Sequence, residues 1–241
     1  MSDSLAGDAL FRPVRAGNAF EETVGRLLQT VRLGIVAPGE ALPAERDLAV
    51  RFSVSRDTVR EAIRSLSDAG FLVSRRGRYG GTFVVDELPA RGAIEGIAPS
   101  APPTLEELDD VLALRGILET GAARAAAARS LSAGERELLW TRLRETAAAS
   151  IADYRRLDSR LHLAIGELVG SPSLVPLLAD NRTRLNELLD RIPLLERNIG
   201  HSNEQHEGIV IAILTGDIQR AESAMEEHLE GSAALLRGFL T

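Results

Sequence analysis

The chain has 241 residues, a formal net charge of −7, no cysteine and no lysine. This length corresponds to one large or two ordinary domains, and the absence of cysteine excludes disulfide frameworks and thiolate metal sites. No apolar run is long enough for a membrane span and residues 1–17 lack the apolar core of a signal peptide, so we expect a cytoplasmic protein with no membrane contact.

The charge is unevenly distributed along the chain. Residues 42–85 contain 8 arginines against 5 acidic residues, whereas the residues from 91 onward contain 16 arginines against 23 acidic residues. A local basic segment favours contact with nucleic acid, and an acidic remainder limits non-specific binding to DNA. Charge counted by segment therefore allows a DNA-binding head on an acidic protein.

The N-terminal part is predicted in three pieces. Residues 1–17 are polar and irregular and are expected to form a flexible tail. Asn18 and Glu21 form a capping-box pattern, and an apolar face follows at helical spacing up to Gly34. Pro38-Gly39 then indicates a turn before the basic segment.

The basic segment predicts a helix-turn-helix. Residues 44–52 favour a short helix, and only Ser53 and Val54 separate it from a second helix that Ser55 can cap and Gly70 can end. The second helix has two faces. Its inward face is apolar and contains Val59, Ala62, Ile63 and Leu66. Its outward face carries three arginines spaced four residues apart, Arg56, Arg60 and Arg64.

A hairpin is predicted directly after these helices. Residues 71–74 and 82–85 have strand character, and the basic, glycine-rich residues 75–81 join them. The arginine stripe alone could be a solvated face balanced by Glu45, Asp57 and Glu61. The adjacent hairpin favours a winged helix-turn-helix that binds DNA.

The segments LPAERDLA, VSRDTVREAI and RRGRYGGTFV resemble the winged helix-turn-helix of GntR-family bacterial regulators. The resemblance implies DNA contacts at seven positions. Arginine can bind guanine bidentately, and a glycine lets the backbone approach the duplex. We interpret the acidic member of the set as holding a neighbouring arginine, with contact to a cytosine amino group as the alternative. The positions are Arg46, Arg56, Asp57, Thr58, Arg60, Arg76 and Gly77.

Beyond the head, residues 18–87, composition separates a linker from a helical domain. Residues 88–103 are rich in proline, glycine, alanine and serine, which predicts a linker. Residues 104–241 show long amphipathic helices interrupted by glycine and proline only at their joints. Thr104 and Glu107 form a capping box for the first of these helices, which runs into the alanine-rich residues 122–128.

Three of the four histidines occupy positions where a helix should be apolar. Asp158 and His162 lie one turn apart on an inward face, and His206 and His228 align with apolar positions on two later helices. Unpaired burial of such groups is costly, so something must compensate them. We predict a divalent metal ion, zinc by preference, with nickel, manganese or iron also suited to the ligands. The alternative is three ordinary core histidines bonded to carbonyls. His201 lies in a polar setting and is assigned to the surface.

The same motifs, D-x-x-x-H at Asp158, QHEGIVIAILTGD and MEEHL, resemble the FCD ligand-sensing domain of FadR-like GntR regulators. Arg115 falls among apolar positions, where a buried guanidinium needs an anion, and the resemblance places an arginine there beside a carboxylate ligand. Asn181 and Arg182 are further candidates for the effector pocket. Leu161, where the family often has phenylalanine, and the turn at 170–172 depart from the family pattern and leave the pocket shape open.

The sequence therefore predicts a mostly α protein with a winged helix-turn-helix and an all-α antiparallel bundle for effector binding and dimerisation. We expect a homodimer that binds double-stranded DNA at a palindromic operator and responds to a small carboxylate effector. One alternative is a purely structural metal with an acyl or protein effector. Another is a metal-dependent hydrolase, for which the pattern supplies no general base.

Overall fold

The computed structural model describes residues 11, 19–77, 80–89, 103–194 and 196–240, and the chain divides into two compact units, 1–100 and 101–241. The mostly helical fold is confirmed, with a small hairpin in the first unit and helices alone in the described part of the second. No helix of the described residues is long and apolar enough to cross a membrane.

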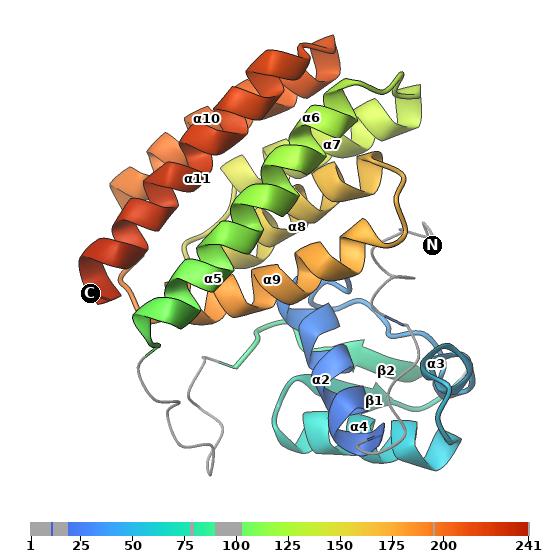
Figure 1. The fold of residues 1–241 in the computed structure, drawn as a ribbon. Coiled ribbons are helices and arrows are strands. Elements are labelled where there is room, and N and C mark those ends of the chain that lie inside the picture. The colour runs from blue at the N-terminus through green and yellow to red at the C-terminus, as the bar shows by residue number, and fades with distance from the viewer. Residues whose placement is uncertain (1–10, 12–18, 78–79, 90–102, 195, 241) are drawn as a thin grey trace. The chain divides into compact units, whose positions relative to one another are not determined.

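The described residues of the first unit form three helices and a hairpin (Figure 1). β1 and β2 pair antiparallel, with Leu72 opposite Val84. The predicted helix-turn-helix and wing are confirmed, and the predicted apolar faces of both helices of the helix-turn-helix are in the core, together with residues of the first helix and the hairpin. The elements are α2 (Ala19–Arg32), α3 (Glu45–Phe52), α4 (Arg56–Asp68), β1 (Leu72–Arg75) and β2 (Gly81–Val84).

Local chemistry fixes the ends of α4. The Ser55 side chain accepts a hydrogen bond from the Thr58 backbone N–H at 3.0 Å, as a helix N-cap should. After the helix, Gly70 has φ of 80°, a left-handed conformation that glycine adopts without a steric cost. The helix thus begins and ends as the sequence predicts.

Most of the expected tail, the Asn18 half of the first capping box and most of the expected linker lie outside the described residues. Phe11 is described, and it is buried in the head core. Its ring centroid lies 5.5 Å from that of Phe52, and the Arg51 guanidinium lies 5.7 Å from the same ring. A single aromatic residue in a polar segment forms no periodic pattern, so this contact could not be predicted from the sequence.

The second unit is an all-helical bundle (Figure 1). The Thr104 and Glu107 capping box is confirmed, with hydrogen bonds of 3.1 and 2.8 Å. Helices α8 and α9 approach closely at Gly166, where an added Cβ would lie 2.2 Å from Leu178 Cδ1. The helices are α5 (Leu105–Arg115), η2 (Gly116–Thr120), α6 (Gly121–Ala127), α7 (Ala133–Ala147), α8 (Tyr154–Leu168), α9 (Leu174–Leu189), α10 (Glu196–Thr215) and α11 (Ile218–Leu240).

A π-helical turn, η2, joins α5 to α6 without a break. Every fourth residue along this segment is buried, namely Val111, Arg115, Glu119, Ala123 and Ala127. A regular α-helix has 3.6 residues per turn and would not keep residues at this spacing on one side. The wider π turn accommodates this spacing and turns Glu119 inward, at 2% exposure. A regular α-helix would place Leu118 on the same face as Val111 and Arg115, but Leu118 is only half-buried.

Candidate metal centre and nucleic-acid interface

The four predicted metal ligands converge in the bundle. Asp158 and His162 come from α8, His206 from α10 and His228 from α11, and one ligand atom of each lies within 4.8 Å of the others. His162 Nε2 is 3.2 Å from His206 Nε2, and His206 Nε2 is 3.3 Å from Asp158 Oδ1. Three helices that are separate in sequence therefore supply one cluster of ligand-type atoms.

Two of the histidines are oriented through their other ring nitrogen. His162 Nδ1 lies 2.7 Å from Glu119 Oε2, and His228 Nδ1 lies 3.2 Å from the amide oxygen of Gln205. Because an amide oxygen can only accept, His228 Nδ1 carries the proton and His228 Nε2 keeps its lone pair. A proton on His162 Nδ1 would likewise face the Glu119 carboxylate. This arrangement, with a carboxylate or carbonyl behind the imidazole, is the usual support of a metal-binding histidine.

The geometry of the cluster fits one ion. His228 Nε2 is buried and has no hydrogen-bond partner among the described residues. Two lone pairs of imidazole nitrogens repel each other unless a proton or a cation lies between them. Ligand atoms about 2.0–2.2 Å from one ion lie about 3.3–3.6 Å apart at the tetrahedral angle. The His162–His206 and His206–Asp158 separations, 3.2 and 3.3 Å, are close to this value, and His162 Nε2 lies 3.8 Å from Asp158 Oδ1.

A buried ion-pair network surrounds the cluster. Arg182 is fully buried and donates to Asp158 Oδ2 and to Glu119 Oε1, the latter at 3.2 Å. Arg115 Nε lies 3.4 Å from Glu119 Oε2. Burial alone would raise the pKa values of Asp158 and Glu119, but the Arg182 guanidinium holds both well below their usual range. Two carboxylates thus face two guanidiniums beside the three imidazoles.

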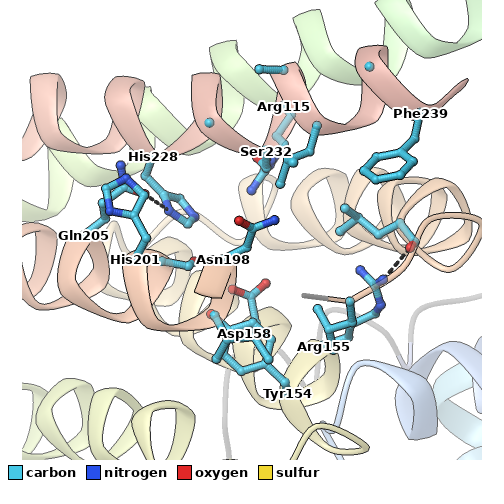
Figure 2. A pocket seen from close by; sticks show the side chains of 18 residues that line it. Arg115, Tyr154, Arg155, Asp158, Asn198, His201, Gln205, His228, Ser232 and Phe239 are labelled. Atoms are coloured by element: carbon cyan, nitrogen blue, oxygen red, sulfur yellow. Dashed lines mark hydrogen bonds between the residues drawn. The ribbon is translucent and has the colours of Figure 1, made fainter. Parts of the chain in front are cut away.

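A cavity of about 490 Å³ opens beside the cluster. Asp158 and His228 line it together with Arg115, which donates to Ser232 Oγ at 2.5 Å (Figure 2). An ion held by the four ligands would therefore face the cavity, with room for a water or a ligand oxygen. Such an open position is typical of a metal site that binds a ligand.

Of the three predicted effector residues, one lines the cavity and two do not. Arg115 lines the cavity, whereas Asn181 and Arg182 are buried and do not. Asn181 donates to the Val111 carbonyl at 3.1 Å, and Arg182 contacts the cluster from the side of α9. The sequence reasoning missed Glu119 and Gln205. A regular α-helix would turn Glu119 away from the buried face, so periodicity gave no signal for it, and nothing distinguished Gln205 from a surface residue.

We expect the metal-free protein to lose stability as pH falls. Burial and the Arg182 guanidinium lower the pKa of His162 to about 4, whereas an unfolded histidine titrates near 6.5. The unfolded chain therefore binds a proton that the folded chain does not, and the stabilisation present above about pH 6.5 is lost towards pH 4. The His162 imidazole alone should lower the free energy of unfolding by roughly 2 kcal/mol between pH 7 and pH 5.

Urea unfolding in the presence of a chelator measures this change, with His162→Gln as the control. The variant lacks the titrating group, so its free energy of unfolding should change less between the two pH values. Equal losses in both proteins would contradict the assignment.

In the head, the predicted DNA-contact residues lie on α3, on the first turns of α4 and beyond β1. Arg56 and Arg60 are exposed on the outward face of α4. Asp57 accepts a hydrogen bond from Arg60 at 2.9 Å, which is the contact expected of a residue that orients an arginine. Glu45 Oε2 lies 3.5 Å from Arg60, so the start of α3 is adjacent to this face.

The remaining predicted positions are also accessible. Arg46 on α3 has a side chain that is 78% exposed. Arg76 and Gly77 follow β1 and are exposed, and Gly77 has φ of 107° with nothing within 4 Å of the place a Cβ would occupy. Thr58 Oγ1 lies 2.8 Å from the Ser55 hydroxyl and is half-buried at the helix cap. Residues 78–79 of the wing lie outside the described residues.

Two family descriptions match these two units. Residues 20–84 match "Bacterial regulatory proteins, gntR family" and residues 110–231 match "FCD domain". The chain belongs to the GntR family and carries an FCD domain. GntR–FCD proteins are transcription regulators and not enzymes, so the hydrolase alternative is set aside, and the buried Asp–His cluster of this regulator is consistent with a metal site.

Curated relatives match most of this GntR–FCD chain. An Escherichia coli K12 protein named as an L-lactate dehydrogenase operon regulator is 30% identical over 208 residues, which cover 83% of this chain and 80% of that protein. The transcriptional regulator LutR of Bacillus subtilis is 27% identical over 217 residues, covering 87% of this chain and 97% of LutR. Among solved structures, E. coli McbR/YncC shares the fold, with a TM-score of 0.54, 18% identity, and coverage of 91% and 97% of the two chains.

Proposed function

We propose that this GntR–FCD protein is a metal-dependent repressor that responds to a carboxylic acid effector. Residues 18–87 would bind one half of a palindromic operator, and residues 104–241 would form a homodimer and bind a carboxylate effector. The single observation that carries the effector half is the convergence of Asp158, His162, His206 and His228 at the wall of a cavity that also contains Arg115. Residues 88–103 would link the two functions.

The charge balance explains why the site would bind an anion. Without a metal, Asp158 and Glu119 are balanced by Arg115 and Arg182, and the pKa of His162, lowered to about 4 by burial, keeps that imidazole neutral. A divalent ion adds two positive charges that the described residues do not balance. An effector carboxylate reaching the ion from the cavity would supply negative charge, and Arg115 would donate to its second oxygen.

The two remaining predicted residues take supporting roles in this proposal. Arg182 would position Asp158 and not touch the effector, because its guanidinium is already shared between Asp158 and Glu119. Asn181 would hold α9 against α5 through the Val111 carbonyl. Three imidazoles and one carboxylate suit zinc first, and nickel, manganese and iron also accept these ligands.

The test is operator affinity, measured by fluorescence anisotropy on a duplex selected from random DNA by the protein. We expect carboxylic acids, beginning with L-lactate because one relative is named for the L-lactate dehydrogenase operon, to change affinity about 5- to 150-fold when zinc is present. The change should disappear with a chelator. Arg115→Gln should keep the metal and lose the response, and a response that survives chelation would contradict the proposal.

We expect Arg56→Ala and Arg60→Ala each to weaken operator binding by about 1–3 kcal/mol if the arginine reads a guanine. Both side chains are exposed, so the fold should be unaffected. Anisotropy at fixed salt measures the loss. Arg220→Ala is the matched control, because it removes the same charge from an exposed site in the bundle. Unchanged binding in both head variants would remove α4 as the recognition helix.

We also expect the full-length protein to sediment as a dimer in the absence of DNA. One head offers few base contacts, so specific binding requires two heads on a two-fold symmetric site. Sedimentation velocity at micromolar concentration measures the state. A monomer that binds the selected duplex at a ratio of one to one would contradict the symmetric operator.

A further inference from the structure

The cavity beside the cluster has two chemically different ends (Figure 2). His228 lies on one side and Phe239 on the other, and the polar residues Arg115, Asp158, Asn198 and Ser232 line the wall between them. The rest of the wall is largely apolar and is supplied by the end of α9, the following loop, α10 and the end of α11. These apolar residues are Leu189, Leu194, Ile199, Leu235 and Phe239.

The apolar residues that line the cavity are only partly buried. Leu189, Leu194, Ile199 and Leu235 are only half-buried, and Phe239 is 51% exposed. Apolar side chains gathered around a cavity lose water contact when a ligand fills it, which favours an apolar ligand surface. A hydroxyl group placed against them would lose its water without gaining a hydrogen bond.

The other basic side chains at the cavity are already engaged or lie in solvent. Arg155 Nε is 3.1 Å from Asp190 Oδ1, and its Nη2 donates to the carbonyls of Leu189 and Ile192. His201 is 67% exposed, and its Nδ1 lies 3.9 Å from Glu204. A second carboxylate on a ligand would therefore find no unengaged arginine at the apolar end, within the part of the chain that the structure describes.

We propose that the effector is a monocarboxylate with an apolar tail, of the medium-chain or arylalkyl class. This inference rests on the proposed function and specifies its ligand. The carboxylate would bind the ion and Arg115, and the tail would lie against Leu235, Phe239 and their neighbours. The volume agrees, since cavities of about 300–1,000 Å³ accommodate ligands far larger than a three-carbon hydroxy acid.

The test is calorimetric titration of the zinc-loaded, full-length protein with straight-chain acids from butanoate to octanoate, with L-lactate, and with octanedioate. Each buried methylene should raise affinity about 3- to 4-fold. Octanedioate has the length of octanoate with a second carboxylate at the far end, and we expect it to bind at least about tenfold more weakly than octanoate. L-lactate should bind no more tightly than butanoate.

Variants separate the two ends of the cavity. Phe239→Ala should weaken octanoate about tenfold and leave butanoate unchanged, whereas Arg115→Gln should weaken both. Ile211→Ala is the matched control, because Ile211 is an exposed apolar residue of the bundle that does not line the cavity. It should change neither acid.

The outcomes distinguish this inference from the function on which it rests. If butanoate, octanoate and octanedioate bind equally, or if L-lactate binds tightest, the apolar tail is wrong and a carboxylate effector remains. If zinc binds and none of the acids does, both the tail and the carboxylate effector are wrong. If Phe239→Ala and Ile211→Ala reduce octanoate binding equally, the tail does not lie at the proposed end.

Discussion

His206→Ala and His228→Ala are each expected to leave the purified protein without its metal. Both imidazoles are buried, and each would supply one of only four protein ligands to the ion. Loss of a group that merely supports a ligand costs about 10- to 100-fold in metal affinity, and loss of a ligand should cost more. Elemental analysis after gel filtration measures the metal content, and the zinc-dependent rise in the unfolding midpoint should disappear in the same variants.

His201→Ala is the control within the same chain. His201 lies on α10, one turn from Gln205, but its side chain is 67% exposed and it is not part of the cluster. This variant should retain the full metal content and the zinc-dependent stabilisation. A full metal content in His206→Ala and His228→Ala would instead restore the interpretation as ordinary core histidines.

Arg182→Leu is expected to destabilise the metal-free protein by about 3–5 kcal/mol, the usual effect of removing one partner of a buried ion pair. The guanidinium is fully buried and bridges Asp158 and Glu119, so its loss leaves two buried carboxylates with Arg115 as the only remaining guanidinium paired with either of them among the described residues. Urea unfolding in the presence of a chelator measures the free energy. Adding Glu119→Gln to the variant should recover part of the loss, because it leaves one buried carboxylate for the one remaining guanidinium.

Arg184→Leu is the matched control for this prediction. Arg184 is two residues further along α9, and its pair with Asp110, at 2.8 Å, lies at the surface with a side chain that is 47% exposed. Exposed pairs contribute about 0–1 kcal/mol. Equal effects of the two substitutions would show that Arg182 fills space in the core and does not balance charge.

The sequence by itself determined the head. Helix faces, the Ser55 cap and the glycine after α4 depend on neighbours within a few residues, and the structure confirms them. The pairing of Asp158 with His162 on one face was also predictable, because the two residues are one turn apart on the same helix. Local periodicity reports which side of a helix is buried, and these features need nothing more.

Only the tertiary structure decided what each buried face meets. That His206 and His228 reach the same point as His162 depends on how α8, α10 and α11 pack, which their separate periodicities do not specify. The π turn moved Glu119 inward against the α-helical pattern and so created the carboxylate behind His162. Arg182 was placed in the pocket wall by sequence, but packing turned its guanidinium onto two carboxylates. The two-ended cavity is likewise assembled from several helices, and no single stretch of sequence carries its pattern.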